Sequence, residues 1–221
     1  MTTPQHAILW DMDGTLLDTT EMHMRAWMMT LEHQGLHITK EDFMRQFGKN
    51  NQSNVLHYLP DATSALIQAI SDEKEQIFCD LVPGNTKVYP GVISWLDYFT
   101  QKGYMQCIAS SAPMHNIEVL LDEIKIGRYF NYIQPGSEVP GKPDPTIFNL
   151  AAQHVGIPAS RCLVIEDAPP GVQAARQAGI RCVAITNTRN TDELSDADLV
   201  IHAFDTPGLH QAEKLLLMTE K

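Results

Sequence analysis

Residues 9–19, with the sequence LWDMDGTLLDT, constrain this chain more than any other stretch. Two carboxylates, Asp11 and Asp13, lie two residues apart directly after a run of apolar residues. Carboxylates this close repel each other, and burying such a pair is costly unless a cation or a shared proton compensates. The pair therefore belongs either to a solvated loop or to a site that holds a metal ion.

Polar residues elsewhere in the chain decide between these two interpretations, but they can be placed only after the order of strands and helices is known. Short apolar runs bounded by turn signals alternate with helical patterns in the second half of the sequence. The expected strands are 6–10, 104–110, 161–165, 181–185 and 199–201, and the helices expected among the later strands are 116–126, 145–155 and 171–178. We expect residues 187–198 to form a solvated loop and a helix start. This alternation is typical of an α/β fold with a parallel sheet covered by helices on both faces. Asp11 and Asp13 then lie at the end of the first strand, where open parallel sheets bind ligands.

Residues 18–88 interrupt the alternation. They show no strand-like run, but four helical patterns, at 21–33, 41–46, 54–58 and 62–81. We therefore predict an all-helical domain over 18–88, inserted into a core made of 1–17 and 89–221. Glycine and proline mark the expected hinge at 84–91, and a second hinge is expected at 18–21.

Other polar residues follow later strands. Ser110 ends the second core strand, Lys142 lies in the loop VPGKPDP, and Glu166 and Asp167 follow the run CLVI. Each has a plain structural explanation, as a strand cap, a surface turn or a helix N-cap. Together at one sheet edge they suit phosphoryl transfer. Carboxylates are ligands for magnesium, and a hydroxyl and an ammonium stabilise phosphoryl oxygens.

In this chemistry one carboxylate attacks phosphorus and forms an aspartyl phosphate, and a second carboxylate moves the proton. Asp11 and Asp167 could supply metal ligands, with Glu166 near by. The backbone carbonyl of Asp13 could be a further metal ligand.

The pattern hhhDxDGTLxDT, then a strand ending in Ser, Lys before Pro, and hhhEDxxxGhxAAxxAG covers nearly the whole chain and resembles the haloacid dehalogenase superfamily. The resemblance implies a Rossmannoid three-layer α/β/α core, a helical cap inserted after the first strand, and Mg2+ as cofactor. By motif position, Asp11 is the nucleophile and Asp13 the general acid/base. The resemblance also implies that the phosphoryl group is held by Ser110 and Lys142, and the metal cluster by Asp11, Asp13, Glu166 and Asp167. The dehalogenase branch lacks the second aspartate, so Asp13 disfavours that branch.

Within the superfamily the chain is most similar to the beta-phosphoglucomutase-like subgroup, through DTTEMHMRAW at 18–27 and VYPG at 88–91. Lys74 resembles the cap lysine of that subgroup. The likeness fails where the mutase grips the distal phosphate of a bisphosphate. Asn51 replaces an arginine there, and Pro113 falls within the stretch that replaces a Ser-Lys-Asn set. A neutral amide cannot supply the missing charge, and Lys49 could do so only as a point charge in a different place.

His23 and Trp27 lie four residues apart and share one face of the first helix of the insert. We expect Trp27 in the core of the insert. His23 either gates or orients Asp13 when the cap closes, or is a surface histidine.

The bulk composition narrows the partners. A net charge of -11 does not favour a nucleic acid or an anionic membrane, and no run of about 18 apolar residues occurs. The N-terminal residues lack the pattern of a signal peptide, and the four cysteines are scattered, so we expect reduced thiols and a cytoplasmic location. A monomer is the default expectation.

The sequence thus predicts a Mg2+-dependent phosphatase that hydrolyses a small phosphomonoester, a sugar or polyol phosphate, through an aspartyl phosphate. Candidate substrate contacts in the cap are His23, Lys49, Asn51 and Lys74. The alternatives are a beta-phosphoglucomutase-type hexose phosphomutase and, more remotely, a non-catalytic binding protein on this scaffold.

Overall fold

The computed structural model describes residues 4–218, so the two extreme ends of the predicted core, 1–3 and 219–221, lie outside the described residues. Six strands form one parallel sheet in the order β5-β4-β1-β6-β7-β8. Its strands are β1 (Ala7–Trp10), β4 (Met105–Ser110), β5 (Tyr132–Pro135), β6 (Cys162–Glu166), β7 (Arg181–Ile185) and β8 (Leu199–Ile201). The five strands expected from the sequence are all present, each within one residue of its expected bounds.

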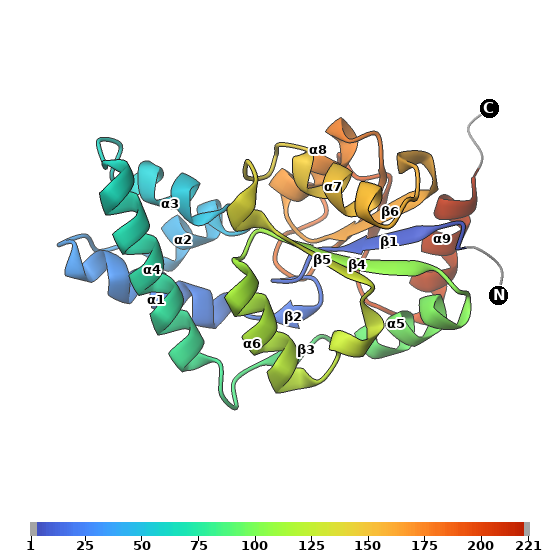
Figure 1. Ribbon diagram of the computed structural model, residues 1–221, viewed down its shortest axis with the longest axis horizontal. Coiled ribbons are helices and arrows are strands. Elements are labelled where there is room, and N and C mark those ends of the chain that lie inside the picture. The colour runs from blue at the N-terminus through green and yellow to red at the C-terminus, as the bar shows by residue number, and fades with distance from the viewer. Residues whose placement is uncertain (1–3, 219–221) are drawn as a thin grey trace.

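Helices cover both faces of this sheet (Figure 1). One face carries α5 (Val92–Gln101), α6 (Met114–Ile124) and α9 (Thr206–Leu217), and the other carries α7 (Thr146–His154) and α8 (Pro169–Gln177). The central strand β1 shows why this happens. Ile8 and Trp10 point into the first layer, Ala7 and Leu9 point into the second, and all four side chains are fully buried. Alternation of side chains along a strand that is apolar on both faces requires two covering layers.

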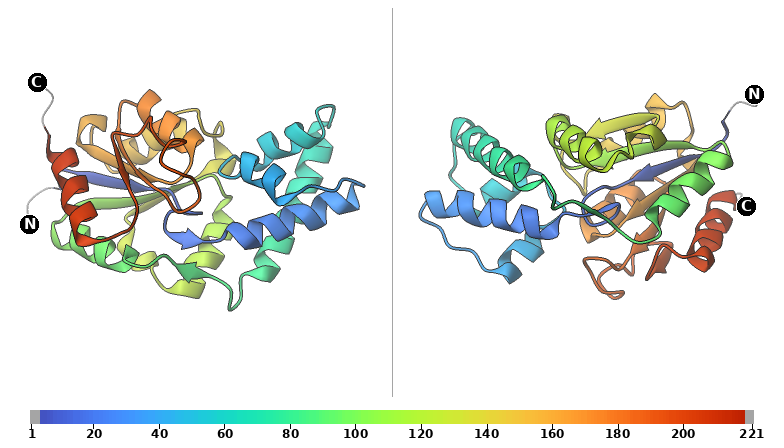
Figure 2. Two further views of the ribbon diagram at one scale, coloured as in Figure 1. Left: turned by 180° about the vertical axis from the view of Figure 1, so that it is seen from behind. Right: turned by 90° about the horizontal axis from the view of Figure 1, so that it is seen from below.

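The four remaining α-helices form a separate group beyond one end of the sheet (Figure 2). These cap helices are α1 (Thr20–His33), α2 (Lys40–Gln46), α3 (Asn51–Tyr58) and α4 (Ser64–Leu81). They share a core of their own, in which Trp27 packs with Leu31, Phe43 and Ile70, as expected for Trp27. Side-chain caps fix the helix starts: Thr39 and Asp42 form a capping box at α2, and Asn50 caps α3.

Some expected boundaries and elements were wrong or missing. A short antiparallel pair, β2 (Leu17–Asp18) with β3 (Lys87–Val88), joins the two ends of the insert, where no strand was expected. The edge strand β5 and helices α5 and α9 were not foreseen. Helix α3 begins at Asn51, three residues early, because the Asn50 side chain accepts from the Ser53 amide. Residues 187–198 form turns and no helix.

Shorter elements complete the described part of the chain: 3-10 turns at Gly127–Tyr129, Gly136–Glu138 and Ala159–Arg161. None of the helices within residues 4–218 is long and apolar enough to cross a membrane. All four cysteines are free, and Cys107, Cys162 and Cys182 are buried, as their apolar surroundings in the sequence indicated.

Candidate active site

Residues from three separate segments meet at the carboxyl ends of β1 and β6. Asp11 directly follows β1, Glu166 is the last residue of β6, and Lys142 reaches them from the loop before α7. The Lys142 Nζ atom lies 2.6 Å from Oδ1 of Asp11 and 2.8 Å from Oε1 of Glu166. All three side chains are buried. The convergence of carboxylate and lysine at one sheet edge is therefore present in the structure.

A cluster of three carboxylates surrounds this lysine. Asp11, Glu166 and Asp167 each offer an oxygen, and these oxygens all lie within 4.8 Å of one another. Burial raises the pKa of Asp11 well above its ordinary value, although the Lys142 charge opposes the rise. Burial, with the neighbouring charge of Glu166, raises the pKa of Asp167 to about 7. A single ammonium does not balance three buried carboxylates, so the donor set fits a divalent cation with a preference for hard oxygen ligands.

Lys142 itself stays charged. Burial alone would lower its pKa, but the charges of Asp11 and Glu166 outweigh burial and raise the pKa above its usual range. The ammonium is thus a fixed positive group in contact with Asp11, as the binding of phosphoryl oxygens requires.

The surrounding loops hold Asp167 and Glu166 in place. Asp167 accepts from the Thr15 hydroxyl at 3.1 Å and from Thr188. Gly14 makes this close approach possible, because it has φ +92° and a Cβ there would lie 2.3 Å from Oδ2 of Asp167. Glu166 turns its second oxygen to the backbone N–H groups of residues 167 and 168, just before α8. The expectation that Glu166 or Asp167 caps this helix is wrong, because the N-cap residue of α8 is Ala168 and no side chain caps the helix.

Asp13 is oriented by a different set of partners. Its Oδ1 accepts from the Thr19 hydroxyl at 2.6 Å and lies 3.1 Å from Nε2 of His23, and its Oδ2 accepts from Ser110 at 3.4 Å. Burial raises the pKa of Asp13, but the adjacent imidazole and these hydrogen bonds outweigh it and hold the pKa below its ordinary value. The Asp13 carboxylate is not in the three-carboxylate cluster. Its carbonyl as a metal ligand stays a prediction.

His23 is a buried residue, with 8% of its surface exposed, so the surface-histidine reading is wrong. It lies between Asp13 and Lys74, and its ring stacks on Phe78 with centroids 4.0 Å apart. Burial and the nearby Lys74 ammonium lower the pKa of His23. The histidine thus carries a contact from the cap helices directly to Asp13.

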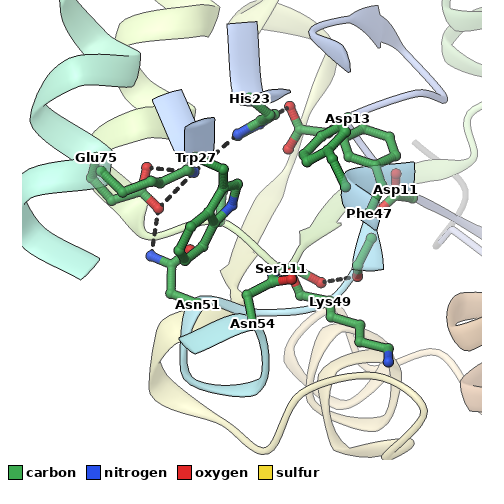
Figure 3. Close-up of a pocket in the computed structure, with 14 residues that line it drawn as sticks. Asp11, Asp13, His23, Trp27, Phe47, Lys49, Asn51, Asn54, Glu75 and Ser111 are labelled. Carbon is green, nitrogen blue, oxygen red and sulfur yellow. Dashed lines mark hydrogen bonds and ion pairs between the residues drawn. The ribbon is translucent and has the colours of Figure 1, made fainter. Parts of the chain in front are cut away.

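The other cap candidates are used unequally. Lys74 is buried, and its Nζ lies 3.0 Å from Nδ1 of His23 and 3.0 and 3.1 Å from the two oxygens of Glu75. Asn51 donates to Oε1 of Glu75 at 2.5 Å. The amine of Lys49 instead points away from Asn51 and Glu75 (Figure 3) and donates to Gln46 at 2.9 Å.

A partly open cavity lies between the cap helices and the sheet (Figure 3). Its volume is about 50 Å³. It is lined by Asp11, Asp13, His23, Trp27, Phe43, Phe47, Gly48, Lys49, Asn51, Asn54, Lys74, Glu75, Ser111 and Ala112. Ser110 is not among the lining residues, although it touches Asp13. No pattern in the sequence predicted a role for Ser111, Phe47 or Thr188. Glu75 could have been suspected as the neighbour of Lys74.

Known proteins share this architecture. A sequence model of the haloacid dehalogenase-like hydrolases matches residues 8–185. Hexitol phosphatase A of Escherichia coli K12 is 29% identical over 89% of this chain and 90% of its own length, and protein CbbY of Rhodobacter capsulatus is 32% identical over 87% and 90%. The structure of beta-phosphoglucomutase from Clostridium difficile has a TM-score of 0.86 at 21% identity, covering 96% of this chain and 97% of its own.

A parallel α/β core with a buried Asp-Asp-Lys site defines the class, and the chain belongs to the haloacid dehalogenase-like hydrolase family. It is a phosphoric monoester hydrolase of that family.

Proposed function

We propose that the protein hydrolyses a small phosphomonoester, a sugar or polyol phosphate, with Mg2+ and through an aspartyl phosphate on Asp11. The observation that carries this proposal is the pairing of Asp11 with the buried Lys142 at 2.6 Å, beside a cavity that Asp11 and Asp13 line. A carboxylate placed against a permanent cation, with a second carboxylate near by, is suited to attack a phosphorus whose oxygens the cation holds. The names of two relatives, hexitol phosphatase A and a phosphorylated carbohydrates phosphatase, support the substrate class.

The metal fits the carboxylates of Asp11, Glu166 and Asp167, which would hold it. When bound, Mg2+ would offset their charge and draw negative charge from the phosphoryl group.

The protein's own residues would then act in two steps. In the first, an Asp11 oxygen bonds to phosphorus and the bond to the leaving oxygen breaks. Asp13, whose carboxylate is ionised before the substrate binds, must take up a proton on substrate binding, and it gives this proton to the leaving oxygen. Lys142 and Ser110 hold the phosphoryl oxygens. In the second, Asp13 takes a proton from water as the water oxygen bonds to phosphorus. The bond between phosphorus and the Asp11 oxygen breaks, which restores the Asp11 carboxylate and frees inorganic phosphate.

The cap helices take part in this proposal as a closing element. We propose that residues 18–88 form a cap on a core of 1–17 and 89–221, with hinges near the β2–β3 pair. His23 supports this role, because it belongs to α1 and binds Asp13, which follows β1. Closure brings His23 to Asp13 and excludes bulk water from the phosphoryl group.

A hexose phosphomutase remains the alternative activity. It would need a positive site for a second phosphate, but Asn51 is bound to Glu75, and Lys49 points away. A non-catalytic protein has less support, because the acid, lysine and hydroxyl groups of the motif are assembled in contact. The cytoplasmic location and the monomeric state stay predictions.

The test is product analysis with Mg2+ and a panel of sugar and polyol phosphates, including beta-glucose 1-phosphate with a trace of glucose 1,6-bisphosphate. Release of inorganic phosphate from one or more monoesters is expected. Glucose 6-phosphate formed without phosphate release would show a mutase, and no turnover of any ester would contradict both activities.

A further inference from the structure

The loop after β7 links the three-carboxylate cluster to the cap through three successive residues. Asn187 donates from Nδ2 to the backbone carbonyl of Gly14 at 2.8 Å. The Thr188 hydroxyl donates to Oδ2 of Asp167. The Arg189 guanidinium donates to backbone carbonyls at the end of α2. One loop therefore touches both the carboxylate cluster and the cap.

Arg189 is a buried cation whose hydrogen bonds go to backbone carbonyls. Only 9% of its side chain is exposed. Its Nη2 donates to the carbonyl of Met44 and, at 3.5 Å, to that of Phe47, and its Nη1 donates to the Thr188 carbonyl at 3.0 Å. The ion pair with the half-exposed Glu193 is long, at 3.7 Å. Two of the three carbonyls that accept from this buried guanidinium thus belong to the cap, and opening of the cap would remove them.

These hydrogen bonds bridge a cleft between the cap and the core. The cleft has a volume of about 450 Å³, with Thr188 and Arg189 lining its core side and Met44 and Phe47 lining its cap side. Because side chains do not fill this space, apolar packing across it is weak. The Met44 carbonyl belongs to the last turn of α2, where carbonyls lack partners within the helix and the helix dipole is negative. A cation at this point therefore holds the helix end to the core.

The end of α2 places Phe47 beside the predicted acid/base. Phe47 is buried and lines the cavity between the cap helices and the sheet. Its ring centroid lies 6.1 Å from that of His23, which contacts Asp13. The position of the α2 end thus decides what packs against the histidine that holds Asp13.

A second core residue also binds the end of α2. The Ser111 hydroxyl donates to the Gly48 carbonyl at 3.1 Å. Of the two core residues that bind this helix end, however, Arg189 is the one that follows a residue in contact with the carboxylate cluster.

The state of Asp167 reaches Arg189 through Thr188. Asp167 belongs to a cluster of three buried carboxylates, which repel one another unless a cation compensates. Cation binding at the cluster would remove this repulsion and fix Asp167, whose Oδ2 accepts from the Thr188 hydroxyl. The carbonyl of the same threonine accepts from Arg189. A change in the position of Asp167 is therefore passed to the guanidinium through two hydrogen bonds on one residue.

We propose that Arg189 is a positioning residue that couples cation binding at the three-carboxylate cluster to closure of the cap. With a divalent cation bound, Asp167 holds Thr188, Arg189 clamps the end of α2, and Phe47 is seated against His23. This proposal rests on the metal site and the cap proposed above, and it adds a link between them.

The test is hydrogen exchange at residues 43–48 of the intact protein without substrate, in EDTA and in Mg2+. Mg2+ is set at about 100 times the dissociation constant that calorimetry gives for each variant. In the wild type, Mg2+ should slow exchange of this segment about fivefold or more, because binding shifts the population towards the closed cap. Arg189→Met keeps a long side chain but removes the donors, so the slowing should shrink to about twofold or less. Unchanged exchange in β1 and β6 establishes that each variant is folded.

Ser111→Ala is the matched control. It removes the other hydrogen bond between the core and the end of α2 but no contact with the carboxylate cluster. Exchange at residues 43–48 should therefore be faster in both buffers, while the ratio between EDTA and Mg2+ stays that of the wild type.

Two further readouts separate coupling from a purely structural role. Thr188→Val breaks the link to Asp167 and should lose the ratio between EDTA and Mg2+ although Arg189 is intact. Because coupling between two sites is reciprocal, Arg189→Met should also bind Mg2+ more weakly, although the arginine is no ligand.

The outcomes separate this proposal from the proposed function, because none of these readouts involves turnover. The proposal is overturned, and the phosphatase left standing, if Arg189→Met or Thr188→Val keeps the wild-type ratio, or if Ser111→Ala loses it as well. The same holds if exchange is not slowed in a wild type that calorimetry shows to bind Mg2+. A wild type that binds no Mg2+ overturns the proposed metal site and the coupling together.

Discussion

The Nζ atom of Lys74 lies 3.0 Å from Nδ1 of His23. An ammonium can only donate, so Nδ1 accepts and the ring proton sits on Nε2, which faces Asp13 at 3.1 Å. A lysine on α4 thereby sets which proton the histidine on α1 presents to Asp13. Two cap helices thus determine how the predicted acid/base is held.

The first prediction concerns this contact. His23→Ala removes a hydrogen bond to an ionised carboxylate, which is worth about 1.5–3 kcal/mol, so kcat is expected to fall roughly 10- to 100-fold. Steady-state kinetics measure kcat with the monoester that the wild type hydrolyses fastest. His33→Ala, on the exposed end of the same helix, should leave kcat within twofold of the wild type. A His23→Ala enzyme with normal kcat would show that the histidine only fills space.

The second prediction concerns the nucleophile. Asp11→Asn keeps the size of the side chain but cannot form a phosphoester, so phosphate release is expected to fall about a thousandfold or more. The fold should survive, because the substitution removes one of three mutually repelling buried carboxylates. A phosphate-release assay and a thermal melt together measure this. Retention of more than a few per cent of activity would rule out Asp11 as the nucleophile.

The third prediction concerns the metal and needs no substrate. Mg2+ at 100 times its dissociation constant should stabilise the fold by about 2.7 kcal/mol, which raises Tm by roughly 5–10 °C for a chain of this size. Asp167→Asn should abolish most of this rise, whereas Asp196→Asn, on an exposed ion pair with Arg176, should keep it. An equal rise in Asp167→Asn would place the ion elsewhere.

The fourth prediction separates two ways in which replacing a glycine lowers the free energy of unfolding: backbone strain and steric overlap. Gly14 and Gly35 both have positive φ, +92° and +74°, but only Gly14 has atoms within reach of an added Cβ. Gly35→Ala should therefore cost only the left-handed strain of about 1–2 kcal/mol. Gly14→Ala should cost a further 1–3 kcal/mol, roughly, because Asp167 and Thr188 must move. Chemical denaturation of both variants measures the difference, and equal losses would mean that the loop at Asp167 yields freely.

The fifth prediction concerns a contact between core and cap. Arg189, between β7 and β8, donates to the backbone carbonyls of Met44 and Phe47 at the end of α2, where the helix dipole is negative. Arg189→Ala should speed hydrogen exchange at residues 43–48 severalfold. Arg176 is an exposed arginine on α8, and Arg176→Ala should leave hydrogen exchange at residues 43–48 unchanged. Unchanged exchange in Arg189→Ala would show that α2 is held by its apolar contacts alone.

The sequence predicted the core well because the central strands are buried on both faces. Continuous apolar runs such as CLVI in β6 can be recognised without knowledge of their neighbours. The polar residues at the ends of these strands could be placed together, because carboxyl ends of parallel strands share an edge. Lys142 was assigned to the same edge from its loop motif, although the strand that precedes it, β5, was not predicted, and it contacts Asp11 in the structure.

The remaining elements depended on contacts that no local pattern reveals. The edge strand β5, with the sequence YIQP, contains a proline, and its apolar residues Tyr132 and Ile133 are only partly buried. The β2–β3 pair has two residues on each side. Glu75 is one of several charges in SDEKEQ, and only the fold shows that it faces Asn51 and Asn116 across the site. The burial of His23 was likewise a matter of how α1 and α4 pack.

Trapping of the phosphorylated protein tests the central claim most directly. The protein is mixed with Mg2+ and a 32P-labelled monoester that it turns over, quenched in acid and mapped by peptide. The account predicts hydroxylamine-labile label on Asp11 that decays to inorganic phosphate at the rate of turnover, and none on Asp11→Asn. Release of labelled phosphate with no label on the protein at any time would contradict it.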